Sequence, residues 1–224
     1  VLHDLLENHS FKWLAKLTPD TVILPEYESY VKSRERSCLR YGLVLEEEGY
    51  EALDSLLASS VAAPLDADDS EFYLANLDDK ACLKEMPFYF TMNDLQTQSL
   101  NQLLAGQATC QPLSARTLSG QLTGFIDLIC EYQGRYYVMD YKSNSLPDYD
   151  AESLESAMRE HNYGLQYFLY SVVLHHYLQQ RLPDYDYDLH FGGVRYLFLR
   201  GMDAAEPMQG VFVDKPELEL IEAI

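Results

Sequence analysis

The stretch that decides the fold is Gly124-Phe-Ile-Asp-Leu-Ile-Cys-Glu-Tyr-Gln-Gly-Arg-Tyr-Tyr-Val-Met-Asp-Tyr-Lys142. Its two halves are rich in β-branched and aromatic side chains, and only Gln133-Gly134 lies between them. This pattern predicts two antiparallel strands joined by a tight hairpin turn. If Tyr132 pairs with Arg135, the same register sets Asp127 opposite Asp140, unless a bulge or an odd-length turn shifts it.

The predicted hairpin brings three charged side chains to one face of the sheet. Cross-strand partners have Cβ atoms about 4.5–5.5 Å apart, close enough for the carboxylates of Asp127 and Asp140 to hold one cation. Lys142 projects from the same face because strand side chains alternate with a period of two. Burying such charges unpaired is costly. Two interpretations therefore stay open: an ion-pair cluster of the three side chains, or a metal ion that offsets the repulsion between the carboxylates.

The rest of the chain predicts helices packed around a sheet. Apolar side chains at mixed three- and four-residue spacings predict helices over residues 1–60, interrupted by Pro19 and Pro25. The other expected elements are an extended segment at 81–90 whose Pro87 favours an edge or a bulge, a short helix at 148–159, a longer helix at 163–182 capped by Asn162, and a strand at 191–200. The implied class is α/β, with a mixed central β-sheet flanked by helices and a helical N-terminal region.

The composition is strongly acidic. The 224 residues include 36 acidic and 16 basic side chains, for a formal net charge of −20. A protein that binds nucleic acid on its own needs surplus lysine and arginine to neutralise phosphates, so the bulk charge weighs against that class. The hydrophobic residues, 47% of the chain, are enough for a substantial core.

Several other classes are disfavoured by the sequence. No apolar run approaches the length of about 20 residues that crosses a bilayer, and no secretory signal opens the chain, so we expect a cytoplasmic protein. The four cysteines show no CxxC pairing and are expected to be buried, reduced thiols. The sequence contains no phosphate-binding GxxxxGK[ST] loop, so nothing in it indicates an ATPase. The first residue is Val1, already within a helical pattern, which favours an excerpt from a longer polypeptide.

The charged hairpin also resembles a known motif. Asp127 followed by Asp140-Tyr-Lys142 resembles the D-(x)n-D/E-x-K motif of the PD-(D/E)xK nuclease superfamily, which by itself is degenerate. The surrounding blocks resemble, more specifically, the RecB-like nuclease domains of that superfamily. These blocks are Val1-Leu-His-Asp-Leu-Leu-Glu7, Gly124-Phe-Ile-Asp-Leu128, Gly134-Arg-Tyr-Tyr137, Asp140-Tyr-Lys-Ser-Asn144, Tyr163-Gly-Leu-Gln-Tyr-Phe-Leu-Tyr170 and His190-Phe-Gly-Gly-Val-Arg-Tyr-Leu-Phe-Leu-Arg-Gly201.

The resemblance implies a fold and a domain plan. It implies a restriction-endonuclease-like core and a single nuclease domain over residues 1–224. Within this domain, residues 1–80 would be mainly helical, and residues 81–213 would form the catalytic α/β core.

The resemblance also implies a metal site. His3, Asp127 and Asp140 match metal ligands of the family, and the backbone carbonyl of Tyr141 would complete the coordination. Mostly oxygen ligands suit Mg²⁺. Lys142 matches the catalytic lysine, whose ammonium can orient or help deprotonate a metal-bound water and stabilise growing negative charge.

Further positions match with weaker implications. Gln166 and Tyr170 match a QxxxY motif, and their four-residue spacing places them on one helix face, where they could aim polar groups at the metal site or the DNA backbone. Glu85 occupies the place of a glutamate found near the site in relatives, and a solvated strand residue is an equal alternative. Some relatives hold an iron–sulfur cluster with three cysteines after the core. No cysteine follows Cys130, so no such cluster is expected.

The function implied by the resemblance is that of a Mg²⁺-dependent DNA nuclease, an exodeoxyribonuclease V-type deoxyribonuclease that hydrolyses phosphodiester bonds with metal-activated water. Its partners would be DNA, as single strands delivered by a helicase in the same polypeptide, and RecC- and RecD-like subunits. The setting would be double-strand break resection and recombination repair in the bacterial cytoplasm.

The alternatives are a catalytically inactive nuclease-fold module that binds or scaffolds, and a different metal hydrolase on the same sheet. Under the favoured interpretation, basic surfaces elsewhere in the complex would hold the strand that this acidic module cuts.

Overall fold

The computed structural model describes residues 1–17 and 26–224, and these form two compact units. The first unit comprises Val1–Cys82, Tyr141–Ser145 and Leu197–Val211. The second comprises Leu83–Asp140, Leu146–Tyr196 and Phe212–Ile224. Pro19 and Pro25, predicted to interrupt the first helices, lie outside the described residues. Within the described ranges, no helix is long and apolar enough to cross a membrane.

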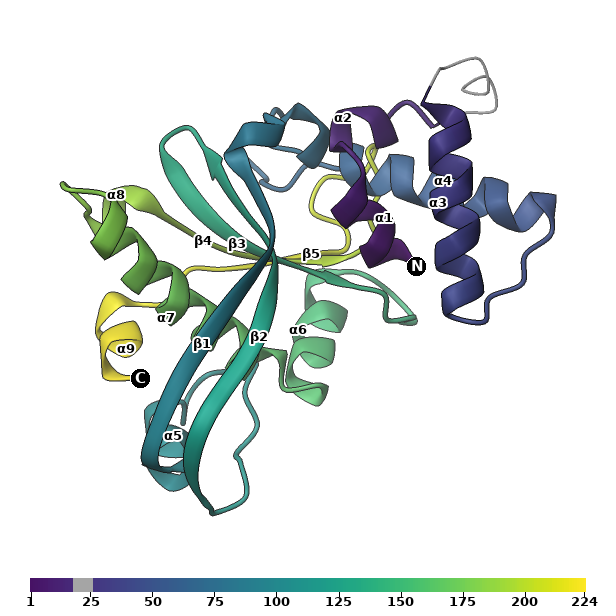
Figure 1. Cartoon of the computed structure of the whole chain (residues 1–224). Coiled ribbons are helices and arrows are strands. Elements are labelled where there is room, and N and C mark those ends of the chain that lie inside the picture. The colour runs from purple at the N-terminus through teal and green to yellow at the C-terminus, as the bar shows by residue number, and fades with distance from the viewer. Residues whose placement is uncertain (18–25) are drawn as a thin grey trace. The chain divides into compact units, whose positions relative to one another are not determined.

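The first unit is helical over its N-terminal part, as predicted. Its helices are α1 (Leu2–Asn8), α2 (Phe11–Leu14), α3 (Tyr27–Arg40) and α4 (Glu47–Ala62), followed by short 3₁₀ turns at Leu74–Asn76 and Asp79–Ala81. Helix α3 packs against α1, and α2 packs against α4 (Figure 1). Fully buried leucines and a valine fill the space between these helices, including Leu5, Leu14, Leu57 and Val61.

A buried charge pair joins α3 to α4. The guanidinium of Arg34 on α3 pairs with the carboxylate of Asp54 on α4, and the Tyr30 hydroxyl donates to the same carboxylate. Burial raises the pKa of Asp54, and the charge of Arg34 opposes that rise. Arg34 also lies over the ring of Tyr50, 4.3 Å from its centroid. The inward-facing cation of α3 is thus already neutralised within the unit.

Within the described residues, the sheet has five strands, which follow one another in chain order. The strands are β1 (Cys82–Gln96), β2 (Thr117–Tyr132), β3 (Arg135–Lys142), β4 (Phe191–Phe198) and β5 (Val211–Asp214). Strands β2 and β3 are antiparallel. Strands β3 and β4 end together, with Leu199 N donating to Lys142 O at 2.9 Å, and three helices lie between them along the chain, as the long crossover of a parallel pair allows. The predicted mixed sheet is confirmed.

The hairpin has the predicted turn and register. Both turn residues, Gln133 and Gly134, have positive φ angles, 50° and 79°, as a two-residue hairpin turn of the favoured hand requires. Tyr132 pairs with Arg135, and the register continues without a bulge to Leu128 opposite Met139.

Strand β1 lies at the edge of the sheet, as Pro87 predicted. Glu85 within it has a φ of 53°, a left-handed conformation that marks a local irregularity in the strand. Figure 1 shows β1 and β2 running on together as a long two-stranded ribbon that reaches α5 (Thr97–Leu103).

The second unit carries the remaining helices, α6 (Ala151–Glu160), α7 (Tyr163–Arg181), α8 (Tyr187–His190) and α9 (Leu218–Ala223). The side chain of Asp150 caps α6 by accepting from Ser153 N. Asn162 occupies the N-cap position of α7, as predicted, but its side chain does not cap the helix. Asn162 has a left-handed conformation with a φ of 53°. Its Oδ1 instead accepts from Gln111 N at 2.9 Å and so fixes a loop.

Candidate functional site

Two aspartates occupy neighbouring positions on β2 and β3 in the second unit. The last pair of the observed register is Leu128 with Met139, and one further step of the same register would set Asp127 opposite Asp140. Asp140 is only 2% exposed, whereas Asp127 is partly exposed. Two carboxylates at such positions repel each other when both are ionised, unless a cation lies between them.

The two carboxylates affect the tyrosines around them. Burial, followed by the negative charge of Asp140, raises the pKa of Tyr170 on α7 and that of Tyr196 on β4. Asp127 raises both pKa values further. The two phenols therefore stay protonated at neutral pH and act as hydrogen-bond donors.

A hydrogen-bonded chain links these tyrosines to the aspartate-bearing strand. The Tyr196 hydroxyl donates to Gln166 Oε1 at 3.1 Å, and Gln166 Nε2 donates to the Tyr170 hydroxyl at 2.8 Å. The Tyr170 hydroxyl donates in turn to the backbone carbonyl of Phe125 at 2.9 Å. Phe125 precedes Asp127 by two residues on β2. The structure thus brings Gln166 and Tyr170 together and connects them to the backbone near the carboxylates.

Tyr196 was not predicted from the sequence as a member of this hydrogen-bonded chain. It lies in an apolar strand and is fully buried, with 0% of its surface exposed. A buried phenol needs a partner for its hydroxyl, and that requirement was the only signal available in the sequence.

Glu85 lies within electrostatic reach of Tyr170. Its charge contributes to the raised pKa of Tyr170, after burial and the two aspartates. The left-handed conformation of Glu85 interrupts the regular alternation of β1. The side chain is half-buried, which agrees better with an approach to this cluster than with full solvation.

In the first unit, His3 and Tyr141 are brought together from positions 138 residues apart. The Nε2 atom of His3, on α1, lies 2.8 Å from the backbone carbonyl oxygen of Tyr141. The two rings also meet edge to face, with centroids 5.8 Å apart. Tyr141 directly follows Asp140 along β3, and the half-buried Lys142 ends the strand. An imidazole and a carbonyl that the resemblance assigns to one ligand set are therefore neighbours.

The donor set is chemically suited to a hard cation. In the part of the chain that the structure describes, no group of three or more His, Cys, Asp or Glu side chains is close enough to form a metal site without further ligands. The second unit offers two carboxylates on adjacent strands, and the first unit, taken by itself, offers a histidine beside a carbonyl oxygen. Mg²⁺ is usually bound by one or two carboxylates and completes its shell with water and substrate phosphate. The two carboxylates are of the residue type that suits that ion.

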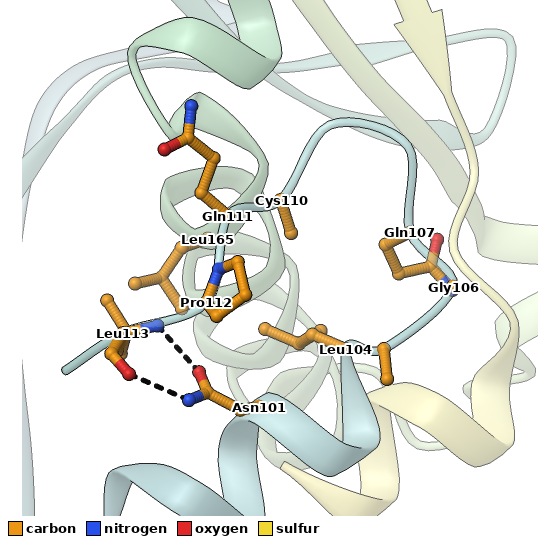
Figure 2. A pocket seen from close by; sticks show the side chains of 10 residues that line it. Asn101, Leu104, Gly106, Gln107, Cys110, Gln111, Pro112, Leu113 and Leu165 are labelled. Atoms are coloured by element: carbon orange, nitrogen blue, oxygen red, sulfur yellow. Dashed lines mark hydrogen bonds between the residues drawn. The ribbon is translucent and has the colours of Figure 1, made fainter. Parts of the chain in front are cut away.

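The second unit also contains an apolar hollow, which does not include the two aspartates. It has a volume of about 230 Å³ and is lined by α5, the loop after it, and Leu165 (Figure 2). Asn101 closes the loop with two hydrogen bonds to the backbone of Leu113, of 2.8 and 2.7 Å (Figure 2). Burial raises the pKa of Cys110, at its wall, to about 11, so this thiol is a poor nucleophile at neutral pH. None of the sequence-predicted site residues lines the hollow.

Comparisons with known proteins agree with the motif. The PD-(D/E)XK nuclease superfamily model matches residues 38–223. The chain is 39% identical over 202 residues to the RecBCD enzyme subunit RecB of Haemophilus influenzae, covering 87% of the chain and 16% of that protein. It is 40% identical over 191 residues to the RecB subunit of Escherichia coli K12, covering 79% of the chain and 16% of that protein. A further RecB subunit, from Mycobacterium tuberculosis H37Rv, is 44% identical over 123 residues, half of the chain and 11% of that protein. The chain thus spans about a sixth of the length of the first two relatives.

Proposed function

Because the chain belongs to the PD-(D/E)XK nuclease superfamily, we propose that it is a Mg²⁺-dependent DNA nuclease that hydrolyses phosphodiester bonds. The observation that carries the proposal is the hairpin register, which runs from Tyr132 with Arg135 to Leu128 with Met139; one further step would set Asp127 opposite Asp140, and Lys142 follows two residues later on the same strand. Residues 81–213 would carry the catalytic core, and the N-terminal helices would contribute His3.

The proposed ligands of Mg²⁺ are the carboxylates of Asp127 and Asp140, with His3 and the backbone carbonyl of Tyr141. When bound, the ion would supply Lewis-acid stabilisation of the negative charge that grows on the phosphate. The aspartates hold a negative potential that favours a cation, since both raise the pKa of Tyr170 and Tyr196.

Lys142 is the proposed catalytic lysine. Its side chain lies on the same strand face as that of Asp140, because the two residues are separated by one position of β3. An ammonium there can hold the attacking water in line by hydrogen bonding and can stabilise charge in the transition state. Neither role requires the lysine to lose its proton first.

Gln166 and Tyr170 are proposed as positioning residues. Their hydrogen-bonded chain fixes helix α7 to the backbone of β2 beside Asp127. Because the Gln166 carbonyl oxygen accepts from Tyr196, the amide can present only its nitrogen to Tyr170. Glu85 is proposed to approach the same cluster and to add to its negative potential.

We further propose that the chain acts within a larger helicase-nuclease. The named relatives are subunits of the RecBCD enzyme. By analogy, a helicase would deliver single strands to this module, RecC- and RecD-like subunits would complete the assembly, and the setting would be double-strand break resection in recombination repair. Access to a bacterial chromosome would place the assembly in the cytoplasm.

Cleavage of labelled single-stranded DNA, measured with Mg²⁺ and again with excess EDTA, tests the proposal. Asp140→Ala and Lys142→Ala are each expected to lower the cleavage rate by at least about 100-fold, the effect of losing one transition-state contact. The matched controls Asp184→Ala and Lys80→Ala remove the same charges at exposed positions. Wild-type rates in both site variants would refute the site. A wild-type protein that binds DNA but never cuts it would favour the inactive binding module instead.

Calorimetric titration with Mg²⁺ separates metal binding from chemistry. Asp127→Ala is expected to weaken Mg²⁺ binding at least tenfold, because the ion would lose one of two charged ligands. Lys142→Ala should not weaken it, because the lysine carries a positive charge. Equal Mg²⁺ binding by wild type and Asp127→Ala would remove Asp127 from the ligand set.

A further inference from the structure

A hollow in the first unit runs beside helix α3 and is distinct from the carboxylate cluster. Its volume is about 410 Å³. It is lined by residues of α3 and by residues at the start of the chain, namely Asp4, Asn8, His9, Ser29, Lys32, Ser33, Arg36, Ser37 and Arg40. We call this hollow the α3 groove. None of the residues proposed for the nuclease site lines it.

The α3 side of the groove is built from two regular rows. Lys32, Arg36 and Arg40 recur at every fourth position, which places them on one face of the helix, and they span about 12 Å along its axis. A parallel row of serines, Ser29, Ser33 and Ser37, recurs at the same spacing beside them. The groove wall therefore combines cations with hydroxyl groups over three helical turns.

The groove has the opposite charge from the chain as a whole. Its lining contains three cations and one carboxylate, that of Asp4, against a net charge of −20 for the whole sequence. Arg34, on the same helix, is not part of the groove, because it is buried and paired with Asp54. A local positive surface on an acidic molecule attracts anions to one place and leaves the remaining surface repulsive.

Two of the three cations of the groove, Lys32 and Arg36, remain available to a ligand. Lys32 pairs with Glu28 of the same helix at 2.6 Å, but both side chains are largely exposed, at 66% and 81%, so the pair is weak. Arg40 pairs with Asp4 at 3.1 Å, and Ser37 also donates to that carboxylate. In residues 1–17 and 26–224, Arg36 forms no ion pair. At least Lys32 and Arg36 can thus turn to an incoming anion at little cost.

We propose that the α3 groove binds the phosphodiester backbone of single-stranded DNA and holds it near the module. This inference rests on the proposed nuclease function and adds a binding surface to it. Guanidinium groups match phosphate oxygens in a bidentate way, and serine hydroxyls are common donors to the DNA backbone. Contacts of this type fix a strand without reading its sequence, as a nuclease that processes any strand requires.

Fluorescence anisotropy with a labelled oligothymidylate tests the groove. The protein carries Asp140→Asn and the buffer contains EDTA, so that binding is read without cleavage. The double variant Lys32→Gln/Arg36→Gln spares the Arg40–Asp4 pair and is expected to bind at least tenfold more weakly at low salt. Loss of two phosphate contacts should also reduce the slope of log affinity against log salt by about 1.4. Arg36→Glu alone, which breaks no ion pair within the described residues, is a second variant that should weaken binding.

The matched control is Lys12→Gln/Lys80→Gln, which removes two exposed cations from the same unit and leaves the groove intact. It should keep wild-type affinity and salt slope. Equal weakening by control and groove variants would show a response to net charge alone and overturn the proposal, as would wild-type binding by both groove variants. Polyglutamate of equal charge and unlabelled oligothymidylate are compared as competitors. If polyglutamate displaced the labelled oligothymidylate as effectively as unlabelled oligothymidylate does, the ligand would be an acidic protein segment instead.

The binding assay also separates this proposal from the nuclease assignment. If the wild-type protein never cleaves DNA, the nuclease assignment fails. The α3 groove is then still judged by the anisotropy of the variants, because that measurement requires no cleavage.

Discussion

The hydroxyl of Tyr170 donates a hydrogen bond to the backbone carbonyl of Phe125, at 2.9 Å. The acceptor belongs to the main chain, so the contact is independent of the Phe125 side chain, which is 57% exposed. The ring of Phe88 packs edge to face against Tyr170, with centroids 5.6 Å apart, and restricts its movement. Helix α7 is thereby fixed to strand β2 two residues from Asp127.

Replacement of Tyr170 by phenylalanine tests this contact. Tyr170→Phe keeps the ring packing but leaves the Phe125 carbonyl and the Gln166 amide without this partner. We expect a loss of about 1 kcal/mol in the free energy of unfolding, measured in urea. If the contact positions Asp127, the variant should also cleave DNA about tenfold more slowly, even at saturating Mg²⁺.

The control for this variant is Tyr177→Phe on the same helix. Tyr177 is 41% exposed, and no hydrogen bond of its hydroxyl is seen in the described part of the chain. Loss of the Tyr177 hydroxyl should change neither the free energy of unfolding nor the rate of DNA cleavage. A Tyr170→Phe protein with lowered stability but a wild-type cleavage rate would limit the contact to a structural role.

The opposed aspartates predict a characteristic response to metal. Asp140→Asn removes one of the two proposed carboxylate ligands and keeps the size of the side chain. Mg²⁺ should raise the melting temperature of the wild type, because it binds only the folded state. The same concentration of Mg²⁺ should shift that of Asp140→Asn much less. Scanning calorimetry with and without Mg²⁺ measures both effects.

Asp184→Asn is the matched control for the change in net charge. Asp184 is exposed and lies after α7, so its amide variant should respond to Mg²⁺ as the wild type does. If Mg²⁺ shifted the wild type and Asp140→Asn equally, the ion would not be held by this pair.

The hairpin could be predicted because its signals are local. The Gln133-Gly134 turn alone sets the register, which the structure confirms from Tyr132 with Arg135 to Leu128 with Met139. The edge position of β1 was likewise predicted from Pro87, since proline cannot donate to a neighbouring strand.

The unpredicted parts depend on contacts distant in sequence. Without a family resemblance, nothing in the sequence indicates that His3 meets the carbonyl of Tyr141, because the two residues are separated by 138 positions. Asn162 has the residue type of a helix cap, yet its side chain bonds to Gln111, a partner that only the folded chain provides. Tyr196 joins the hydrogen-bonded chain through Gln166, and only the folded structure brings these two side chains together.

Gly164 near the start of α7 predicts a tight steric requirement. A Cβ atom there would lie 2.5 Å from the backbone oxygen of Thr109 and 2.7 Å from the sulfur of Cys110. Backbone atoms cannot move aside cheaply, so Gly164→Ala should destabilise the protein by about 1–3 kcal/mol. Gly106→Ala, where a Cβ would meet nothing within 4 Å, is the control and should unfold at the wild-type urea concentration or higher. A Gly164→Ala protein as stable as the wild type would contradict the packing described.

His175 on α7 predicts a dependence of stability on pH. It is 2% exposed, and its Nδ1 lies 3.1 Å from the Tyr185 hydroxyl. Burial, followed by the charge of His176, lowers its pKa below 6.5, and Glu222 opposes this weakly. Below about pH 6.5 the unfolded chain therefore binds a proton that the folded chain does not, so this contribution to stability is complete above pH 6.5 and declines as the pH falls.

Urea unfolding at pH 7.5 and pH 5.0 measures this contribution. Carboxylates also titrate on the way to pH 5.0, so the informative quantity is the difference between proteins. His175→Phe should lose less stability between the two pH values than the wild type does, because it has no imidazole to protonate on unfolding. His176→Gln should retain most of the wild-type loss, since burial is the larger cause of the lowered pKa of His175. Equal losses in the wild type and His175→Phe would mean that the buried imidazole does not cause the acid sensitivity.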